Sequence, residues 1–92
     1  MAKHLRITGL VQGVGYRASF DAQASELRLS GWVRNRIDGS VEAVVRGNAE
    51  SVGEIIAWAR RGPAAARVHD VRVTEVDDAS VSDGPFEMLP TK

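Results

Sequence analysis

Hydrophobic and polar residues alternate near the start of the chain. Within residues 4–11, Leu5 and Ile7 share one parity, while the polar Arg6 and Thr8 occupy the other. Successive side chains of a strand point to opposite faces, so this pattern predicts a strand with one buried face. The residues that follow include two closely spaced glycines, a composition that predicts a turn.

The next segment changes from strand spacing to helical spacing. Between residues 16 and 29, apolar side chains recur every three or four positions, which places them on one stripe of a helix. These side chains are Tyr16, Phe20, Ala24 and Leu27. Polar residues occupy the other faces, and Ser30-Gly31 is expected to end the helix.

Residues 31–37 and 40–46 alternate again and predict a β-hairpin. Asp38-Gly39 between them is a strong turn signal, because glycine adopts a positive φ without a steric penalty. Each strand has one mostly apolar face, formed by Val33, Asn35 and Ile37 in the first strand and by Val41, Ala43 and Val45 in the second.

The last part of the chain predicts a second helix and two more strands. Asn48 is a suitable N-cap, and Gly62-Pro63 is expected to end the helix. The apolar stripe of this helix comprises Val52, Ile55, Ile56 and Ala59. Residues 67–76 are rich in valine, and the change of parity between Val68 and Val71 predicts a bulge or a late strand start. A polar loop then leads to a short final strand at 86–89.

The predicted order is strand, helix, strand, strand, helix, strand and a short additional strand. This order defines the split βαβ, or ferredoxin-like, plan of the α+β class. Right-handed crossovers would place both helices on one face of an antiparallel sheet. We therefore expect a single domain over residues 1–92.

Composition narrows the range of functions. The net charge is zero, which argues against a large nucleic-acid surface. The absence of cysteine excludes disulfides, thiolate chemistry and cysteine-built metal sites. No apolar run is long enough to span a membrane, and the polar N-terminus does not resemble a signal peptide. We expect a cytoplasmic protein that acts as a monomer, with no nucleic-acid or membrane partner.

The first strand-to-helix junction is a candidate anion site. The N–H groups that open a helix lack intrahelical partners, and Gly13 and Gly15 would let an anion approach them. Arg17 follows in the first turn, where its guanidinium could bind two phosphate oxygens. The spacing matches neither a P-loop nor a dinucleotide-binding fingerprint, so these glycines taken alone favour a simple tight turn.

Asn35 is the second candidate. Asparagine is uncommon in strands, yet Asn35 shares the parity of Val33 and Ile37. A side-chain amide on a buried face needs hydrogen-bond partners. The alternative is an asparagine at the hairpin end that faces water.

Two sequence blocks resemble the acylphosphatase family. The first is Gly9-Leu10-Val11-Gln12-Gly13-Val14-Gly15-Tyr16-Arg17, and the second is Gly31-Trp32-Val33-Arg34-Asn35, followed by Asp38-Gly39-Ser40-Val41-Glu42. Gly62-Pro63, Val68 and Phe86 also fall where similar sequences have them, so the resemblance covers nearly the whole chain. Gly15-Tyr16 departs from the two phenylalanines of many members.

The resemblance implies an enzyme that hydrolyses acyl phosphates to a carboxylate and inorganic phosphate, with no metal or organic cofactor. The phosphate-binding loop would comprise Gln12, Gly13, Val14, Gly15, Tyr16 and Arg17. Backbone N–H groups of this loop and the Arg17 guanidinium would bind the phosphate, and the Asn35 amide would orient the attacking water. Because a carboxylate is a good leaving group, the reaction needs positioning and charge stabilisation more than a strong acid.

Other functions remain open at the level of the sequence. RNA-binding domains of this topology need exposed aromatic residues on central strands, and metal chaperones need a Cys-x-x-Cys loop; the chain has neither. A regulatory relative that binds acyl phosphates without turnover is a third possibility. His4 and His69 are expected at the surface, away from the chemistry, and Arg34 and Arg36 are expected to face away from Asn35.

Overall fold

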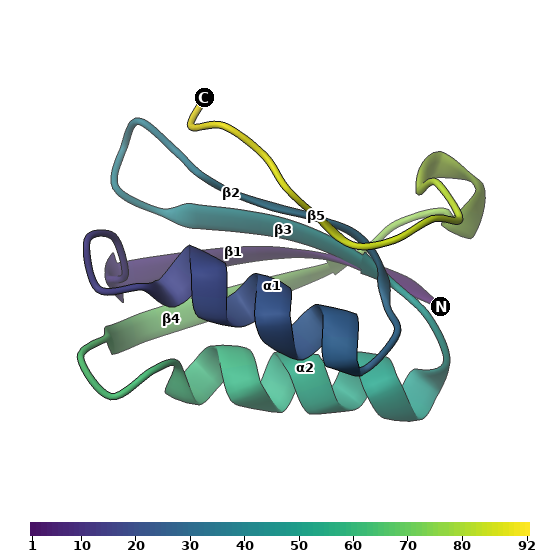
Figure 1. Ribbon diagram of the computed structural model, residues 1–92, viewed down its shortest axis with the longest axis horizontal. Coiled ribbons are helices and arrows are strands. Elements are labelled where there is room, and N and C mark those ends of the chain that lie inside the picture. Colours follow the sequence, from purple (N-terminus) through teal and green to yellow (C-terminus); the bar gives the residue numbers. More distant parts are fainter.

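The computed structural model describes the whole chain, Met1–Lys92, as a sheet covered on one face by two helices (Figure 1). The elements are β1 (Ala2–Leu10), α1 (Tyr16–Glu26), β2 (Ser30–Asn35), β3 (Val41–Arg46), α2 (Ala49–Arg61), β4 (Arg67–Glu75), a short 3₁₀ turn (Asp78–Ser80) and β5 (Glu87–Met88). The strand order is β4-β1-β3-β2-β5. The predicted ferredoxin-like arrangement is therefore confirmed.

The direction of β5 differs from the expected antiparallel sheet. The four longer strands pair antiparallel, but β5 runs parallel to β2, with Trp32 opposite Glu87 and Val33 opposite Met88. The sheet is therefore mixed. Residues 77–86 carry the chain from β4 at one edge of the sheet to β2 at the other, and β5 then runs along β2 (Figure 1). A two-residue strand has too little pattern for its direction to be predicted.

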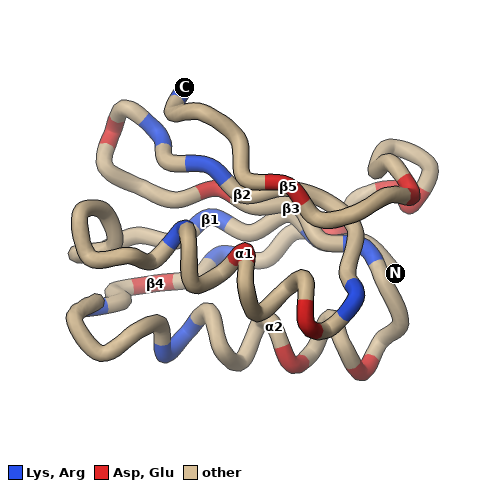
Figure 2. Tube along the Cα trace, viewed as in Figure 1, with Lys and Arg blue, Asp and Glu red and all other residues tan.

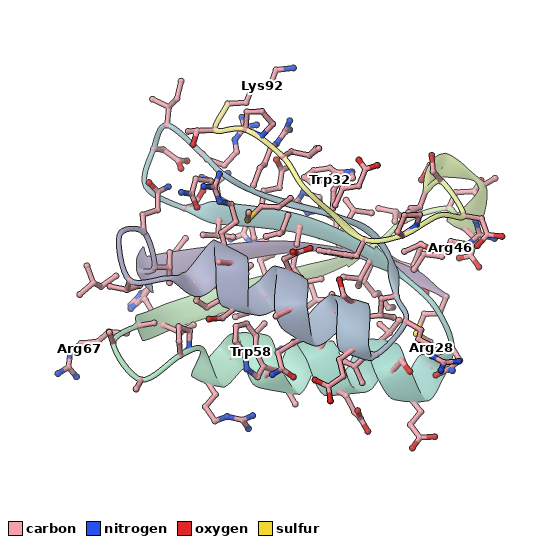
Figure 3. All side chains as sticks on the ribbon, in the orientation of Figure 1. Arg28, Trp32, Arg46, Trp58, Arg67 and Lys92 are labelled. Atoms are coloured by element: carbon pink, nitrogen blue, oxygen red, sulfur yellow. The ribbon has the colours of Figure 1, made fainter.

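The core fills the space between the sheet and the helices. The apolar residues predicted on one face of β1 and β3 are fully buried there, and they pack against the apolar stripes of α1 and α2. These core residues include Leu5, Ile7, Val41, Ala43, Val45, Tyr16, Phe20, Val52 and Ile55. Burying a large apolar side chain contributes about 1.5–3 kcal/mol, so this layer dominates the stability of the fold. Trp58 covers it between the helices, against Tyr16 and Phe20 (Figure 3).

The helix α1 ends three residues earlier than predicted. Its last helical residue is Glu26, and Arg28 adopts a left-handed conformation with φ of 58°. The N–H of Leu29 donates to the carbonyl of Ala24, which satisfies an orphan carbonyl at the helix end. This early turn lets Leu29 enter the core, where its side chain is buried. Packing of Leu29 therefore outweighs the helical spacing of the sequence.

The predicted bulge lies in β4. Thr8 of β1 pairs with Asp70 and Gly9 pairs with Val68, which leaves His69 as the extra residue. A Cβ at Gly9 would lie 2.2 Å from the carbonyl oxygen of Arg67, so only glycine fits this close approach. Pairing of β1 with β3 ends at Ile7, whereas pairing with β4 continues to Leu10. The end of β1 thus separates from the β2–β3 hairpin, and the loop to α1 begins beside this opening.

No helix has both the length and the apolar character that a membrane span requires.

Candidate active site

The connection between β1 and α1 is shaped by two glycines with positive φ. Gly13 has φ of 75° and Gly15, the N-cap of α1, has φ of 79°. A Cβ at either position would meet nothing within 4 Å, so the backbone conformation, and not a lack of space, favours glycine here. The same open space leaves the loop backbone accessible from outside.

The N–H groups of this loop form an unpaired run. None of the backbone N–H groups from Gly13 to Ala18 donates to an acceptor within the protein; the first that does is Ser19, to Gly15 at 3.0 Å. No side chain caps α1, and its first turn contains no acidic residue. The positive end of the helix dipole is therefore not neutralised by the protein. Such a run of donors is suited to an anion.

A cavity of about 330 Å³ lies against this loop. The loop and the first turn of α1 form one wall, and Asn35 and Met88 come from neighbouring strands. The lining residues are Val11, Gln12, Gly13, Gly15, Tyr16, Arg17, Ala18, Asn35 and Met88. The structure therefore brings the two sequence blocks together at one cavity. Of the predicted loop residues, only Val14 does not line it.

Arg17 is half-buried in the wall of this cavity and has no carboxylate partner. Its guanidinium donates one hydrogen bond of 3.2 Å, to the backbone carbonyl of Leu89. None of the ion pairs of the protein includes it. Figure 2 shows a basic position at the start of α1, with acidic positions only on its later turns. The Arg17 guanidinium therefore keeps most of its hydrogen-bonding capacity for a ligand.

Asn35 is the last residue of β2, opposite Val41 of β3. Its side-chain oxygen Oδ1 is buried without a hydrogen-bond partner in the protein, and it is the only buried side-chain N or O atom in this position. An unsatisfied buried acceptor destabilises a fold by about 1–3 kcal/mol, so it calls for an explanation. Asn35 as a whole is half-buried at the end of β2, so the alternative of a water-facing asparagine fits its position but not its buried Oδ1. Ile37, expected on the same face, instead lies at the hairpin tip and is 86% exposed, because β2 ends at Asn35.

Two predicted loop residues direct their side chains elsewhere. The Gln12 amide nitrogen Nε2 donates to the carbonyls of Arg36 and Ser40 at 2.7 and 2.8 Å. The Tyr16 hydroxyl donates to the carbonyl of Ala59 at 2.7 Å, and burial raises the pKa of this hydroxyl well above its usual range. At Tyr16, therefore, only the backbone N–H can serve the cavity.

The opposite face of the sheet carries a network of paired charges. Glu42 accepts from His4 at 2.7 Å, from Arg34 at 2.8 Å and from Arg36 at 3.3 Å. Burial raises the pKa of Glu42, but the hydrogen bonds from His4 and Arg34 and the charge of Arg34 outweigh burial and hold it below its usual value. Arg34 and Arg36 thus face away from Asn35, as predicted. His4 differs from the expectation, because it is half-buried in this network.

His69 lies exposed in the β4 bulge, as expected for a surface residue. The chain contains no group of three His, Asp or Glu side chains that could hold a metal ion. Met88 and the carbonyl of Leu89 were not predicted as part of the site. No motif indicated them, because their place depends on β5 pairing beside β2. The cavity offers unpaired donors, one cation and one unpaired amide oxygen, which suits a phosphorylated ligand and an ordered water.

Comparisons with known proteins identify the family of the chain. The profile of the family described as acylphosphatase matches residues 3–88. An acylphosphatase from Azoarcus sp. is 57% identical over 91 residues, 98% of this chain and 90% of the relative, and one from Rhodopseudomonas palustris is 59% identical over 95 residues, 99% and 96%. The solved acylphosphatase from Coxiella burnetii superimposes with a TM-score of 0.87 at 36% identity, covering 96% of this chain and 90% of that one. The chain belongs to the acylphosphatase family and is a hydrolase that acts on acyl phosphates.

Proposed function

We propose that the cavity beside Gly13–Arg17 is the site where this acylphosphatase binds and hydrolyses its substrate. The observation that carries the proposal is the meeting, at one cavity, of unpaired loop N–H groups, a cation without a carboxylate partner and a buried amide oxygen without a donor. Each of these groups keeps hydrogen-bonding capacity that the protein does not use, and each has a partner in an acyl phosphate and its attacking water.

The phosphoryl group is held by the loop. The N–H groups from Gly13 to Ala18 donate to its oxygens, and the dipole of α1 adds favourable charge at the same end. Arg17 binds the same group through its guanidinium, whose remaining donors are directed by the bond to the Leu89 carbonyl. As negative charge shifts onto the phosphoryl and leaving oxygens in the transition state, these fixed donors stabilise it without reorganising.

Asn35 holds the attacking water. Its Oδ1 accepts a hydrogen bond from the water, which orients an oxygen lone pair toward phosphorus. The water oxygen forms a bond to phosphorus while the bond to the acyl oxygen breaks, and the carboxylate leaves with the electron pair. The leaving group has a low pKa, so it needs no general acid. The proton of the water passes to an oxygen of the phosphoryl group, which would explain why no carboxylate or histidine of the protein lines the cavity.

The test compares Asn35→Ala with Asn48→Ala, a matched change at the cap of α2. Hydrolysis of acetyl phosphate is followed without added metal, below the unfolding temperature of both variants. We expect Asn35→Ala to lower kcat by roughly 100-fold with little change in KM, because one positioning group is lost after binding. Asn48→Ala should keep kcat. An Asn35→Ala variant with full kcat would contradict the water-orienting role.

The same assay separates a regulatory relative from an enzyme, because such a relative would bind inorganic phosphate but not turn over acetyl phosphate. We further propose that the enzyme works in the cytoplasm as a monomer, without metal or cofactor and without a nucleic-acid partner. The zero net charge supports the part of this proposal that concerns nucleic acids. Inhibition by EDTA, or a dimer in light scattering, would contradict it.

A further inference from the structure

Gln12 bridges the opening between the phosphate loop and the β2–β3 hairpin. β1 stops pairing with β3 at Ile7, so the backbone of residues 11–15 makes no hydrogen bond to the hairpin. The direct hydrogen bonds across the gap come from the Gln12 side chain, at 2.7 and 2.8 Å to the carbonyls of Arg36 and Ser40. Both bonds come from one nitrogen, Nε2, so each of the two amide protons makes one hydrogen bond.

The two acceptors, the carbonyls of Arg36 and Ser40, flank the turn of the β2–β3 hairpin. Arg36 directly follows Asn35, and its N–H donates to the same Ser40 carbonyl at 2.8 Å. Asp38 holds the N–H and hydroxyl of Ser40 at 2.9 and 2.6 Å, so the second acceptor is itself fixed. The Gln12 amide is therefore bonded to the carbonyl of the residue that follows Asn35, and Gln12 also lines the cavity.

We propose that Gln12 is a positioning residue, whose side chain sets the distance between the phosphate loop and the Asn35 amide. This inference rests on the proposed roles of the loop and of Asn35. The loop holds phosphorus and Asn35 holds the water, so their separation defines the line of attack. A displacement of about 1 Å between reacting groups can slow a reaction by on the order of 100-fold.

Two substitutions at Gln12 distinguish this role from general packing. Gln12→Met keeps the length of the side chain and donates nothing. Gln12→Glu has the same shape, and its ionised carboxylate cannot donate, but its protonated form offers one O–H to a carbonyl. The usual pKa of a glutamate carboxyl is about 4.3, and nearby carbonyl oxygens raise it, whereas Arg17 in the same cavity lowers it.

The experiment measures kcat and KM for acetyl phosphate, and the affinity for inorganic phosphate, from about pH 4.5 to pH 8. Near pH 8, we expect both variants to lower kcat by roughly 10- to 100-fold. KM and the affinity for phosphate should change by less than about threefold. Toward acid pH, the deficit of Gln12→Glu relative to wild type should shrink, while that of Gln12→Met should stay constant. Gln23→Glu, the same change in the groove between the helices, should not alter kcat.

A double-mutant cycle with Asn35→Ala completes the test. If Gln12 acts through Asn35, then Gln12→Met should lower kcat by less than about threefold in the Asn35→Ala background. Additive losses, or full kcat in Gln12→Met while Asn35→Ala is impaired, would overturn this inference and leave the proposed function intact. Full kcat in Asn35→Ala would instead overturn the proposed function. If Gln12→Glu does not fold, the Gln12→Met cycle alone decides.

Discussion

The arginines near the β2–β3 hairpin and the arginine at the cavity have different partners on the two faces of the sheet. On the open face, Arg34 and Arg36 both pair with Glu42, and Arg6 pairs with Asp38. On the helix-covered side, Arg17 lies at the cavity and meets only a backbone carbonyl. Paired charges satisfy one another and stabilise the fold locally, whereas an unpaired cation beside unpaired N–H groups remains available to a ligand.

The contrast extends beyond the ion pairs. The Arg34 guanidinium lies over the Trp32 ring at 4.7 Å on the open face, and Trp32 packs there against a small cluster separate from the core that Trp58 covers. Near the cavity, the amide oxygen of Asn35 has no partner at all. The charged network around Glu42 is thus satisfied within the protein, whereas the groups at the cavity are not. Variants on the two faces should therefore separate into those that change stability and those that change catalysis.

The largest effect should follow from removing the unpaired charge. We expect Arg17→Gln to lower kcat/KM for acetyl phosphate by roughly 100-fold or more, because Arg17 stabilises charge in the transition state as well as binding the phosphate. The affinity for inorganic phosphate, measured by calorimetry, should fall with it. Arg34→Gln, the same change on the open face, should alter kcat/KM by less than about threefold. Equal losses in both variants would remove the distinction between the faces.

A smaller effect of the opposite kind should follow from Glu42→Gln. We expect a loss of about 1–2 kcal/mol in the free energy of unfolding near neutral pH, because three charge-assisted contacts are weakened at a partly exposed site. The kcat should stay within about threefold of wild type. Urea unfolding, monitored by tryptophan fluorescence, measures the loss.

The stability lost in Glu42→Gln should depend on pH in a definite direction. The pKa of Glu42 is lowered in the folded state, so the folded protein binds fewer protons than the unfolded chain near that pKa. The stabilisation is present above the unfolded value of about 4.3 and is lost as the pH falls through the folded pKa. The difference between wild type and Glu42→Gln should therefore shrink below about pH 4.5. A difference that grows in acid would contradict the assignment.

Periodicity and local signals predicted most of the fold. The Asn48 cap formed as expected, with Ser51 donating at 2.8 Å, and the parity change in β4 located the bulge at His69. The predicted end of α1 was wrong, because the burial of Leu29 depends on tertiary contacts, which the helical spacing of the sequence does not show. The direction of β5 also depends on contacts distant in sequence.

At the cavity, too, local sequence signals predicted some residues and missed those that depend on tertiary contacts. Arg17 and Asn35 stood in recognisable blocks, so they could be predicted as site residues, and their catalytic roles remain predictions. The side-chain contacts of Gln12 were not predictable, because a single amide bridging two carbonyls has no sequence pattern. Met88 was missed for a similar reason, since it reaches the cavity only through the pairing of β5 with β2.

The smallest effect should come from the apolar part of the cavity, where no charge is involved. Met88 lines the cavity and is 47% exposed, so its side chain is available to contact the acyl group of a substrate. We expect Met88→Ala to raise KM for benzoyl phosphate by roughly three- to tenfold, since about 1 kcal/mol of apolar contact is lost. KM for acetyl phosphate should change by less than about twofold, because its methyl group makes few such contacts.

Ile37→Ala is the matched control for Met88, because Ile37 is also an exposed apolar side chain but does not line the cavity. Its KM values for both substrates should equal those of wild type. Steady-state kinetics on the two substrates give the KM ratio for each variant. If Met88→Ala raised KM equally for both substrates, Met88 would act on the shared phosphoryl site, and the division of the cavity into a polar phosphoryl part and an apolar acyl part would be wrong.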